Sequence, residues 1–281
     1  MIHDKPNQDM PRRTRGQKMV CGLPFHVLPH QEVLEEMEAN IRGPRRPQFI
    51  SITNSEVMYY SRRMSFLVDH IRSATFSLCD SISIVFAGAL QGVKLKRFTG
   101  PDLMEKSCRY GTRQEWRHFF CGGAQGVAEL LSANLTAKCP RLITAGTYCP
   151  PFRPLTSSEE NEMIQAINAA KPDILWIGLG AVRQELWIAR FFGRLDIPWI
   201  VGVGGAFDYH AQTVPRAPKW LRALGMEWLY RLCREPWRFK RILSSYVNLL
   251  EVALETVRGR PVVLGNSTVN EAPAWRGKPK L

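Results

Sequence analysis

The sequence lacks the features of a membrane-spanning, secreted or metal-binding protein. No stretch approaches the roughly 18 consecutive apolar residues of a spanning helix, and the N-terminus has no apolar segment typical of a secretory signal. The seven cysteines include no C-x-x-C pair, and the six histidines show no metal-ligand spacing. We therefore expect a cytoplasmic protein without a metal or other cofactor, and any contact with a membrane must be peripheral.

Two nucleotide-binding motifs are also missing. There is no complete G-x-G-x-x-G, which weakens the case for a dinucleotide cofactor, and no P-loop. Acidic residues are also few. The chain has 25 of them against 38 basic residues, which gives a net charge of +13. This excess favours an anionic partner, such as a nucleic acid, a phosphorylated small molecule or an anionic lipid surface.

Short apolar segments alternate with amphipathic ones along most of the chain. The segments with strand character are Gln48–Thr53, Thr75–Cys79, Lys94–Phe98, Trp116–Cys121, Leu142–Ala145, Asp173–Gly178 and Pro198–Val203. Those with helix character are Gln31–Arg42, Ser55–Ser73, Asp102–Tyr110, Ala124–Lys138, Ser158–Ala170 and Val182–Arg194. This order predicts an α/β fold, a Rossmann-like and mostly parallel sheet with helices on both faces.

The character of the chain changes after this core. From Arg216 onward the sequence is helical, basic and rich in tryptophan, and no strand is expected before Val262–Leu264. Two helices, Lys219–Leu232 and Trp237–Val257, are expected on either side of Glu235-Pro236, because proline interrupts helices. The expected units are a disordered arm (1–18), a core (19–214), a basic helical appendage that associates with membranes (215–260) and a tail (261–281).

Glycines gather where three of the expected strands end. They are Gly122-Gly123, Gly178-Leu179-Gly180 and Gly202-Val203-Gly204-Gly205. Ligands of open parallel sheets bind beyond the carboxyl ends of the strands, where backbone N–H groups can cradle a phosphate. The alternative is that these glycines serve backbone geometry alone.

Asp80 and the C-terminal arginines each allow two interpretations. Asp80 follows an expected strand and either caps the next helix or acts as a general base at a phosphate-binding cleft. The arginines Arg231, Arg234, Arg238 and Arg241 recur at helical spacing among aromatic residues. They form either a solvated face or an interfacial helix pair whose arginines meet phosphates.

Short segments between about Val20 and Arg241 resemble, in their order, the WecG/TagA/CpsF family of bacterial glycosyltransferases. No single segment is decisive, but their shared order is highly specific. They are Asn54-Ser55-Glu56, Asp80, Arg97-Phe98-Thr99-Gly100-Pro101-Asp102-Leu103, Gly122-Gly123, Pro172-Asp173-Ile174, Gly178-Leu179-Gly180, Gln184-Glu185, Gly202-Val203-Gly204-Gly205-Ala206-Phe207-Asp208, Arg216-Ala217-Pro218, Glu227-Trp228-Leu229-Tyr230-Arg231-Leu232, Glu235-Pro236, Arg238 and Arg241.

The resemblance implies an inverting, metal-independent transfer of a hexose from a UDP-sugar to a polyprenyl-diphosphate-linked saccharide. The reaction would occur at the inner face of the cytoplasmic membrane, in the synthesis of an exopolysaccharide, capsule or cell-wall polymer. Asp80 would be the catalytic base, and Arg231, Arg238 and Arg241 would hold a diphosphate. The other expected substrate-binding residues are Thr53, Asn54, Gly122, Gly123, Gly180, Gln184, Glu185, Gly204, Gly205 and Asp208.

The chain departs from the family pattern at several positions, including Ser81, where the family usually has glycine after the aspartate. The donor sugar is therefore open between N-acetylmannosamine, glucose and another hexose. A homo-oligomer is also left open. Two rival classes follow from single features: a nucleotide-dependent oxidoreductase from the glycine turns, and a nucleic-acid-binding protein from the charge.

Overall fold

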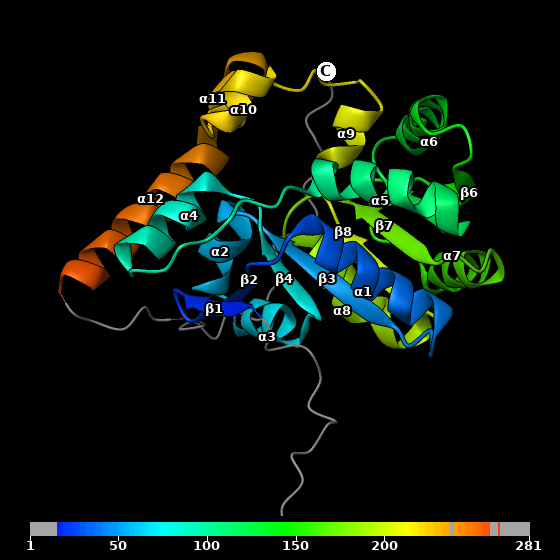
Figure 1. The fold of residues 1–281 in the computed structure, drawn as a ribbon, viewed down its shortest axis with the longest axis horizontal. Coiled ribbons are helices and arrows are strands. Elements are labelled where there is room, and N and C mark those ends of the chain that lie inside the picture. Colours follow the sequence, from blue (N-terminus) through cyan, green and yellow to red (C-terminus); the bar gives the residue numbers. More distant parts are fainter. Residues whose placement is uncertain (1–15, 237–238, 259–263, 265–281) are drawn as a thin grey trace, which may run out of the picture.

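The computed structural model describes residues 16–236, 239–258 and 264 of the chain. Its centre is a six-stranded, wholly parallel sheet with the strand order β4-β3-β8-β7-β5-β6. Helices cover both faces of this sheet (Figure 1), so the expected α/β fold class is confirmed. The strands are β3 (Gln48–Thr53), β4 (Phe76–Cys79), β5 (Arg117–Gly122), β6 (Ile143–Tyr148), β7 (Ile174–Gly178) and β8 (Trp199–Gly202).

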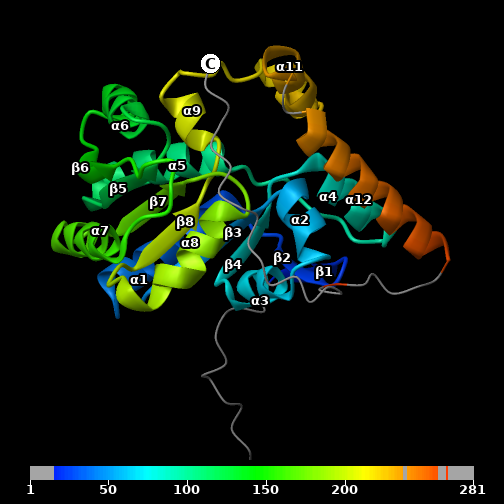
Figure 2. The same ribbon diagram turned by 180° about the vertical axis from the view of Figure 1, so that it is seen from behind.

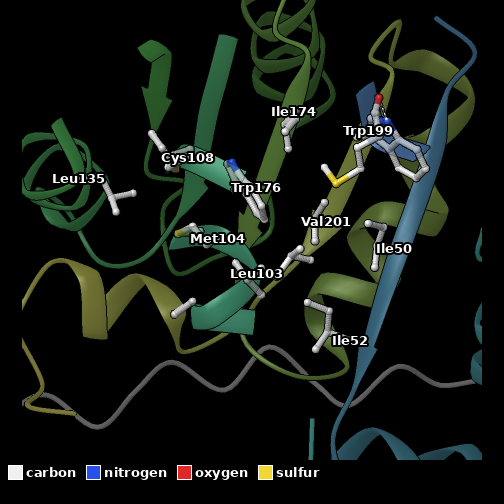
Figure 3. Packing of buried hydrophobic residues seen from close by; sticks show 14 of the residues in the cluster. Ile50, Ile52, Leu103, Met104, Cys108, Leu135, Ile174, Trp176, Trp199 and Val201 are labelled. Carbon is white, nitrogen blue, oxygen red and sulfur yellow. Dashed lines mark hydrogen bonds between the residues drawn. The ribbon is translucent and has the colours of Figure 1, made fainter. Parts of the chain in front are cut away.

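Alternating side chains of the strands fill two separate cores. Ile50, Trp176 and Trp199 point to the core beneath the helices α1 (His30–Arg42), α5 (Gly100–Gln114) and α6 (Val127–Lys138) (Figure 3). Their neighbours Phe49 and Leu175 point to the opposite core, beneath the helices α7 (Ser157–Ala169) and α8 (Arg183–Phe191). This two-residue period is the geometry of an extended strand, and burial on both faces explains why the strands are nearly continuous apolar runs.

The helices of the core connect the strands and follow their carboxyl ends. They are α1 (His30–Arg42), α2 (Ser55–Ser61), α3 (Ser65–Ser73), α4 (Ile82–Leu90), α5 (Gly100–Gln114), α6 (Val127–Lys138), α7 (Ser157–Ala169), α8 (Arg183–Phe191) and α9 (Ala206–His210). A short 3-10 helix, Phe192–Arg194, extends α8.

The local structure before α4 and between α4 and α5 differs from the expectations in three places. Lys94–Phe98 is not a strand; it crosses from α4 to α5 without regular structure, although Phe98 N donates to Cys79 O at 2.6 Å. The helix expected over Ser55–Ser73 is two helices, because a turn at 62–64 separates α2 from α3. An antiparallel hairpin of β1 (Gln17–Val20) and β2 (Leu23–His26) was not expected, and it includes two residues assigned to the arm.

Three helices follow the core, namely α10 (Lys219–Ala223), α11 (Glu227–Arg234) and α12 (Phe239–Val257). The first expected helix is divided because Gly225 has a positive φ of 72° at the turn between α10 and α11. Helix α12 runs back along α2 and α4 (Figures 1 and 2). Arg62 bonds Glu255 through both terminal nitrogens, at 2.6 and 2.9 Å, and Val252 is fully buried. The tail expected over 261–281 lies outside the described residues, apart from Leu264.

Candidate active site

A cleft of about 210 Å³ opens at the carboxyl ends of β3, β4, β7 and β8. Seven of the residues expected to form the site line it: Asn54, Asp80, Gly180, Gln184, Gly204, Gly205 and Arg231. Four others, Thr53, Gly122, Gly123 and Glu185, do not, and neither does Asp208. Arg238 lies outside the described residues, and so does the side chain of Arg241, which belongs to α12.

Asp80 stands directly after β4, on the wall of the cleft. Its backbone is fixed twice, because its N–H donates to Thr53 O at 3.0 Å and its carbonyl accepts from Arg97 Nε at 2.8 Å. The N-cap of α4 is the next residue, Ser81, whose hydroxyl accepts from Ser83 N. Helix capping at α4 is therefore the role of Ser81, whereas Asp80 lines the cleft.

Asn54 and Thr53 illustrate how neighbouring residues at a strand end divide their roles. Asn54 lines the cleft and also caps α2, since its Oδ1 accepts from Glu56 N and Val57 N, each at 3.0 Å. Thr53 is fully buried, and its hydroxyl pairs with that of Ser51 at 3.2 Å. Thr53 therefore supports the strand rather than facing a ligand.

Gln184 is locked in one orientation at the floor of the cleft. Its Nε2 donates to Glu185 Oε1 at 2.9 Å, and its Oε1 accepts from Gly204 N at 2.8 Å. Burial raises the pKa of Glu185 to about 7, although the hydrogen bond from Gln184 opposes the rise. Glu185 lies beneath the cleft and positions Gln184, which itself lines the cleft.

The three glycine turns expected to cradle a phosphate do not have the same role. Gly180 and Gly204, with φ of 86° and 51°, and Gly205 line the cleft. Gly122 instead lies against the backbone of β7, where an added Cβ would approach Gly178 C to 2.6 Å. Gly123 N donates to Gly178 O at 3.0 Å. At this turn the glycines serve backbone geometry alone, because glycine permits close approach of two strand ends.

Arg231, from α11, reaches the cleft while held by groups behind it. Its Nε lies 2.7 Å from Glu235 Oε2, its Nη2 lies 3.6 Å from Asp208 Oδ2, and its Cζ lies 4.9 Å from the Tyr209 ring centre. The described part of the chain offers its buried Nη2 no hydrogen-bond partner. Asp208 thus anchors an arginine instead of lining the cleft. A guanidinium fixed in this way is suited to an anionic ligand.

A charge network that the sequence reasoning did not place in the site joins α11 to the core. Arg97 Nη2 lies 2.9 Å from Glu227 Oε2, and Arg216 Nη1 lies 2.9 Å from Asp102 Oδ1. Arg216 Nε also lies 3.5 Å from Glu227 Oε1. These residues stood in the ordered motifs, but two of the three pairs, Arg97–Glu227 and Arg216–Asp102, join residues more than a hundred positions apart. The network holds the Arg231 helix over the cleft.

No metal site accompanies this cleft in the part of the chain that the structure describes, since no three His, Cys, Asp or Glu side chains gather there in a way that could hold an ion. A carboxylate, an anchored arginine and two glycine turns share one cleft at the carboxyl ends of parallel strands. This arrangement is typical of α/β enzymes that bind phosphate-bearing substrates.

The comparison with known families identifies which class of such enzymes is involved. The sequence model of the glycosyl transferase WecG/TagA/CpsF family matches residues 18–261. The chain therefore belongs to this family, as its ordered motifs predicted.

Three similar curated proteins share one name, N-acetylglucosaminyldiphosphoundecaprenol N-acetyl-beta-D-mannosaminyltransferase. The protein of that name from Bacillus subtilis is 29% identical over 196 residues, which cover 69% of this chain and 75% of the relative. The Bacillus spizizenii protein is 28% identical, with 75% and 80% covered. The Staphylococcus aureus protein (strain MW2) is 25% identical, with 73% and 79% covered.

Proposed function

We propose that the protein is an inverting glycosyltransferase that moves a hexose from a UDP-sugar to a polyprenyl-diphosphate-linked saccharide. One observation carries the proposal: Asp80 and Arg231 line the same cleft in a chain of the WecG/TagA/CpsF family. A carboxylate and a fixed guanidinium are the groups that such a transfer needs, one for the acceptor hydroxyl and one for the diphosphate.

Asp80 acts as the general base in this proposal. Its carboxylate takes the proton of the acceptor hydroxyl as that oxygen attacks the anomeric carbon of the donor. The new carbon–oxygen bond forms while the bond from the anomeric carbon to the phosphate oxygen breaks, and UDP leaves with the electron pair. A single displacement of this kind inverts the anomeric configuration. The rigid backbone of Asp80 supports the role, because a base must be held in position for attack.

Arg231 stabilises a diphosphate. The leaving group gains negative charge as UDP departs, and an arginine already oriented by Glu235 and Asp208 meets that charge without reorganisation. Arg238 and Arg241 are proposed to assist it on the strength of the family resemblance. The expected independence of a metal ion is part of the same proposal, since arginines would carry the charge that a cation otherwise balances.

The acceptor and donor classes are inferred from the relatives. The names of the relatives specify a diphosphoundecaprenol-linked N-acetylglucosamine acceptor and transfer of N-acetylmannosamine. We propose a polyprenyl-diphosphate saccharide for this chain and leave the hexose open between N-acetylmannosamine, glucose and others. The product would be a cell-wall polymer, capsule or exopolysaccharide.

The proposed location is the inner face of the cytoplasmic membrane. None of the helices in the described residues combines the length and apolar character needed to cross a bilayer. Large apolar side chains are exposed on the C-terminal helices, including Trp220 at 63% and Leu250 at 62%. Such residues in a chain with a net charge of +13 suit an anionic membrane. Co-sedimentation with anionic but not neutral vesicles, weakened by Trp220→Ala, is expected; equal recovery with both would contradict this location.

A donor screen tests the function directly. The purified protein is incubated with individual UDP-sugars and N-acetylglucosaminyl diphosphate carrying a farnesyl chain, with and without EDTA. Formation of a disaccharide with at least one UDP-sugar, unchanged by EDTA, is the expected result. Absence of transfer from every UDP-sugar would overturn the proposal. NAD binding or salt-sensitive oligonucleotide binding in its place would favour the oxidoreductase or nucleic-acid alternative.

A further inference from the structure

A second cavity, of about 300 Å³, lies between α4, α11 and α12. Its side chains are mainly apolar and come from successive turns of the helices that form it. Ile82 and Phe86 share one face of α4, and Ile242, Tyr246 and Leu249 share one face of α12. The complete lining is Ser55, Ser81, Ile82, Ser83, Phe86, Leu224, Gly225, Met226, Trp228, Ile242, Tyr246 and Leu249, which we call the apolar groove.

The apolar groove is continuous with the cleft that contains Asp80. Six residues line both: Ser55, Ser81, Ile82, Gly225, Trp228 and Ile242. Three hydroxyls mark the boundary, because Ser81 Oγ lies 3.1 Å from Ser55 Oγ and 2.7 Å from Ser83 Oγ. An acceptor whose saccharide lies in the cleft can therefore extend into the apolar groove without leaving the protein.

The far end of the groove is open and apolar. The exposed fractions of Phe86, Leu224 and Tyr246 are 56%, 64% and 49%. Trp228 packs edge-on against Tyr246, with the ring centres 5.5 Å apart, and closes the wall between α11 and α12. Exposed apolar side chains that form a continuous hollow mark a binding site rather than ordinary surface.

We infer that the apolar groove binds the isoprene units next to the diphosphate of the acceptor. The inference rests on the proposed function and extends it to the part of the substrate that does not react. The order of groups along the cleft and the groove matches the acceptor: its reacting saccharide would lie near Asp80 and its hydrocarbon among Phe86, Tyr246 and Leu249, with the boundary hydroxyls between them. Continuity with the cleft favours this occupant over a second protein copy, which could enter the groove but would have no reason to reach the cleft.

The test compares two acceptors and two matched double variants. N-acetylglucosaminyl diphosphate is prepared with a farnesyl chain or with a methyl group. The groove variant Phe86→Ala/Tyr246→Ala is compared with Leu90→Ala/Leu250→Ala. Each control residue stands one helical turn beyond its partner and is similarly exposed, but neither lines the groove. The assays contain no detergent or membrane, so only the protein can contact the chain.

In the wild type, KM for the farnesyl acceptor is expected to be roughly tenfold to a hundredfold below KM for the methyl acceptor. The groove variant should lose most of this ratio, and the control variant should keep it. An unchanged ratio in the groove variant would overturn the inference. An equal loss of activity with both acceptors would also overturn it, because such a loss indicates a merely structural effect. The inference would fail as well if the groove variant changed only the oligomeric state, as measured by sedimentation.

A wrong assignment of the groove and a wrong proposed function would give different experimental results. If the wild type transfers sugar to both acceptors with the same KM, the function stands and the groove does not bind the chain. If a preference for the farnesyl chain appears only after vesicles are added, the hydrocarbon is held by the bilayer, and the groove assignment is again wrong. If neither acceptor receives sugar from any UDP-sugar, the proposed function is wrong and the inference falls with it.

Discussion

Two glycine pairs lie at the carboxyl edge of the same sheet, Gly122-Gly123 at the end of β5 and Gly204-Gly205 after β8. Around the first pair, the neighbours are backbone atoms of Gly178 and the side chain of Val127. Around the second, they are functional groups, namely Gln184, which accepts from Gly204 N, and Arg231, whose Nη1 an added Cβ on Gly205 would approach to 2.7 Å.

The carboxyl edge of this sheet therefore has two parts with different roles, which we call the chemical half and the packing half. The chemical half comprises the ends of β3, β4 and β8 with the end of β7, and is covered by α11. The packing half comprises the ends of β5 and β6. Substitutions in the first half should change catalysis and leave the fold, whereas substitutions in the second should do the reverse.

The largest effect is expected from Asp80→Asn in the chemical half. The amide keeps the shape of the side chain but cannot accept the proton, so kcat should fall by about 10³- to 10⁴-fold. UDP binding by calorimetry and the thermal unfolding midpoint should match the wild type, because the backbone bonds of Asp80 remain. Turnover within tenfold of the wild type would contradict the base assignment.

Gly122→Ala probes the packing half and should cost roughly 4 kcal/mol of unfolding free energy. The residue combines a φ of 138° with a Cβ position 2.6 Å from Gly178 C, so both strain and overlap arise. Urea unfolding measures the loss. Gly126→Ala is the matched control, since Gly126 also has a positive φ, of 82°, but nothing lies within 4 Å of its Cβ position. Equal loss in both variants would mean that strain alone, and not strand contact, defines this half.

The sheet itself was predictable from sequence, because buried parallel strands are apolar runs that end at polar or glycine residues. Lys94–Phe98 was mistaken for a strand because its exposed lysines alternate with more buried residues, a period that an irregular crossing segment can share. The hairpin β1–β2 was missed because its first strand, Gln17–Val20, begins in the polar, basic N-terminal segment and is exposed at its middle residues, so it is not an apolar run.

The site was predictable only in part, for a physical reason. Asp80, Gln184 and Arg231 stood in ordered motifs, and the structure brings them to one cleft. Which glycine turn faces that cleft depends on strand order, and β5 is separated from β8 by β7. The pairing of Arg97 with Glu227 likewise arises from tertiary packing, which no local pattern records.

Glu185 lies beneath the chemical half, and a pH series tests to which half it belongs. Its folded-state pKa is raised from 4.5 to about 7, so the folded protein binds a proton that the unfolded chain releases between these values. Its contribution therefore makes the protein less stable as pH rises from 4.5 to 7, and then levels off. Glu185→Gln removes this loss of stability. As pH rises across that window, the unfolding free energy of the variant should gain on the order of 3 kcal/mol relative to that of the wild type.

Urea unfolding of both proteins at several pH values measures the gain as a difference. The side-chain amide introduced by Glu185→Gln can still accept from Gln184 Nε2, so sugar transfer should change little if Glu185 only positions Gln184. A stability difference that stays constant with pH would contradict the raised pKa. A large loss of kcat with unchanged stability would move Glu185 into the chemical half.

Gly205→Ala is expected to have the smallest effect and is the sharpest test of the division. Its φ of −69° suits alanine, so no backbone strain arises, and the unfolding free energy should fall by no more than about 1 kcal/mol, the contribution of the disturbed Arg231 ion pairs. The added methyl group must displace the Arg231 guanidinium, which is the far end of a flexible side chain, and kcat/KM should fall about tenfold. Gly193→Ala, where nothing lies within 4 Å, should leave both quantities unchanged. If Gly205→Ala lowered stability as much as Gly122→Ala and left transfer intact, the two glycine pairs would serve the same purpose and the division of the sheet edge would be lost.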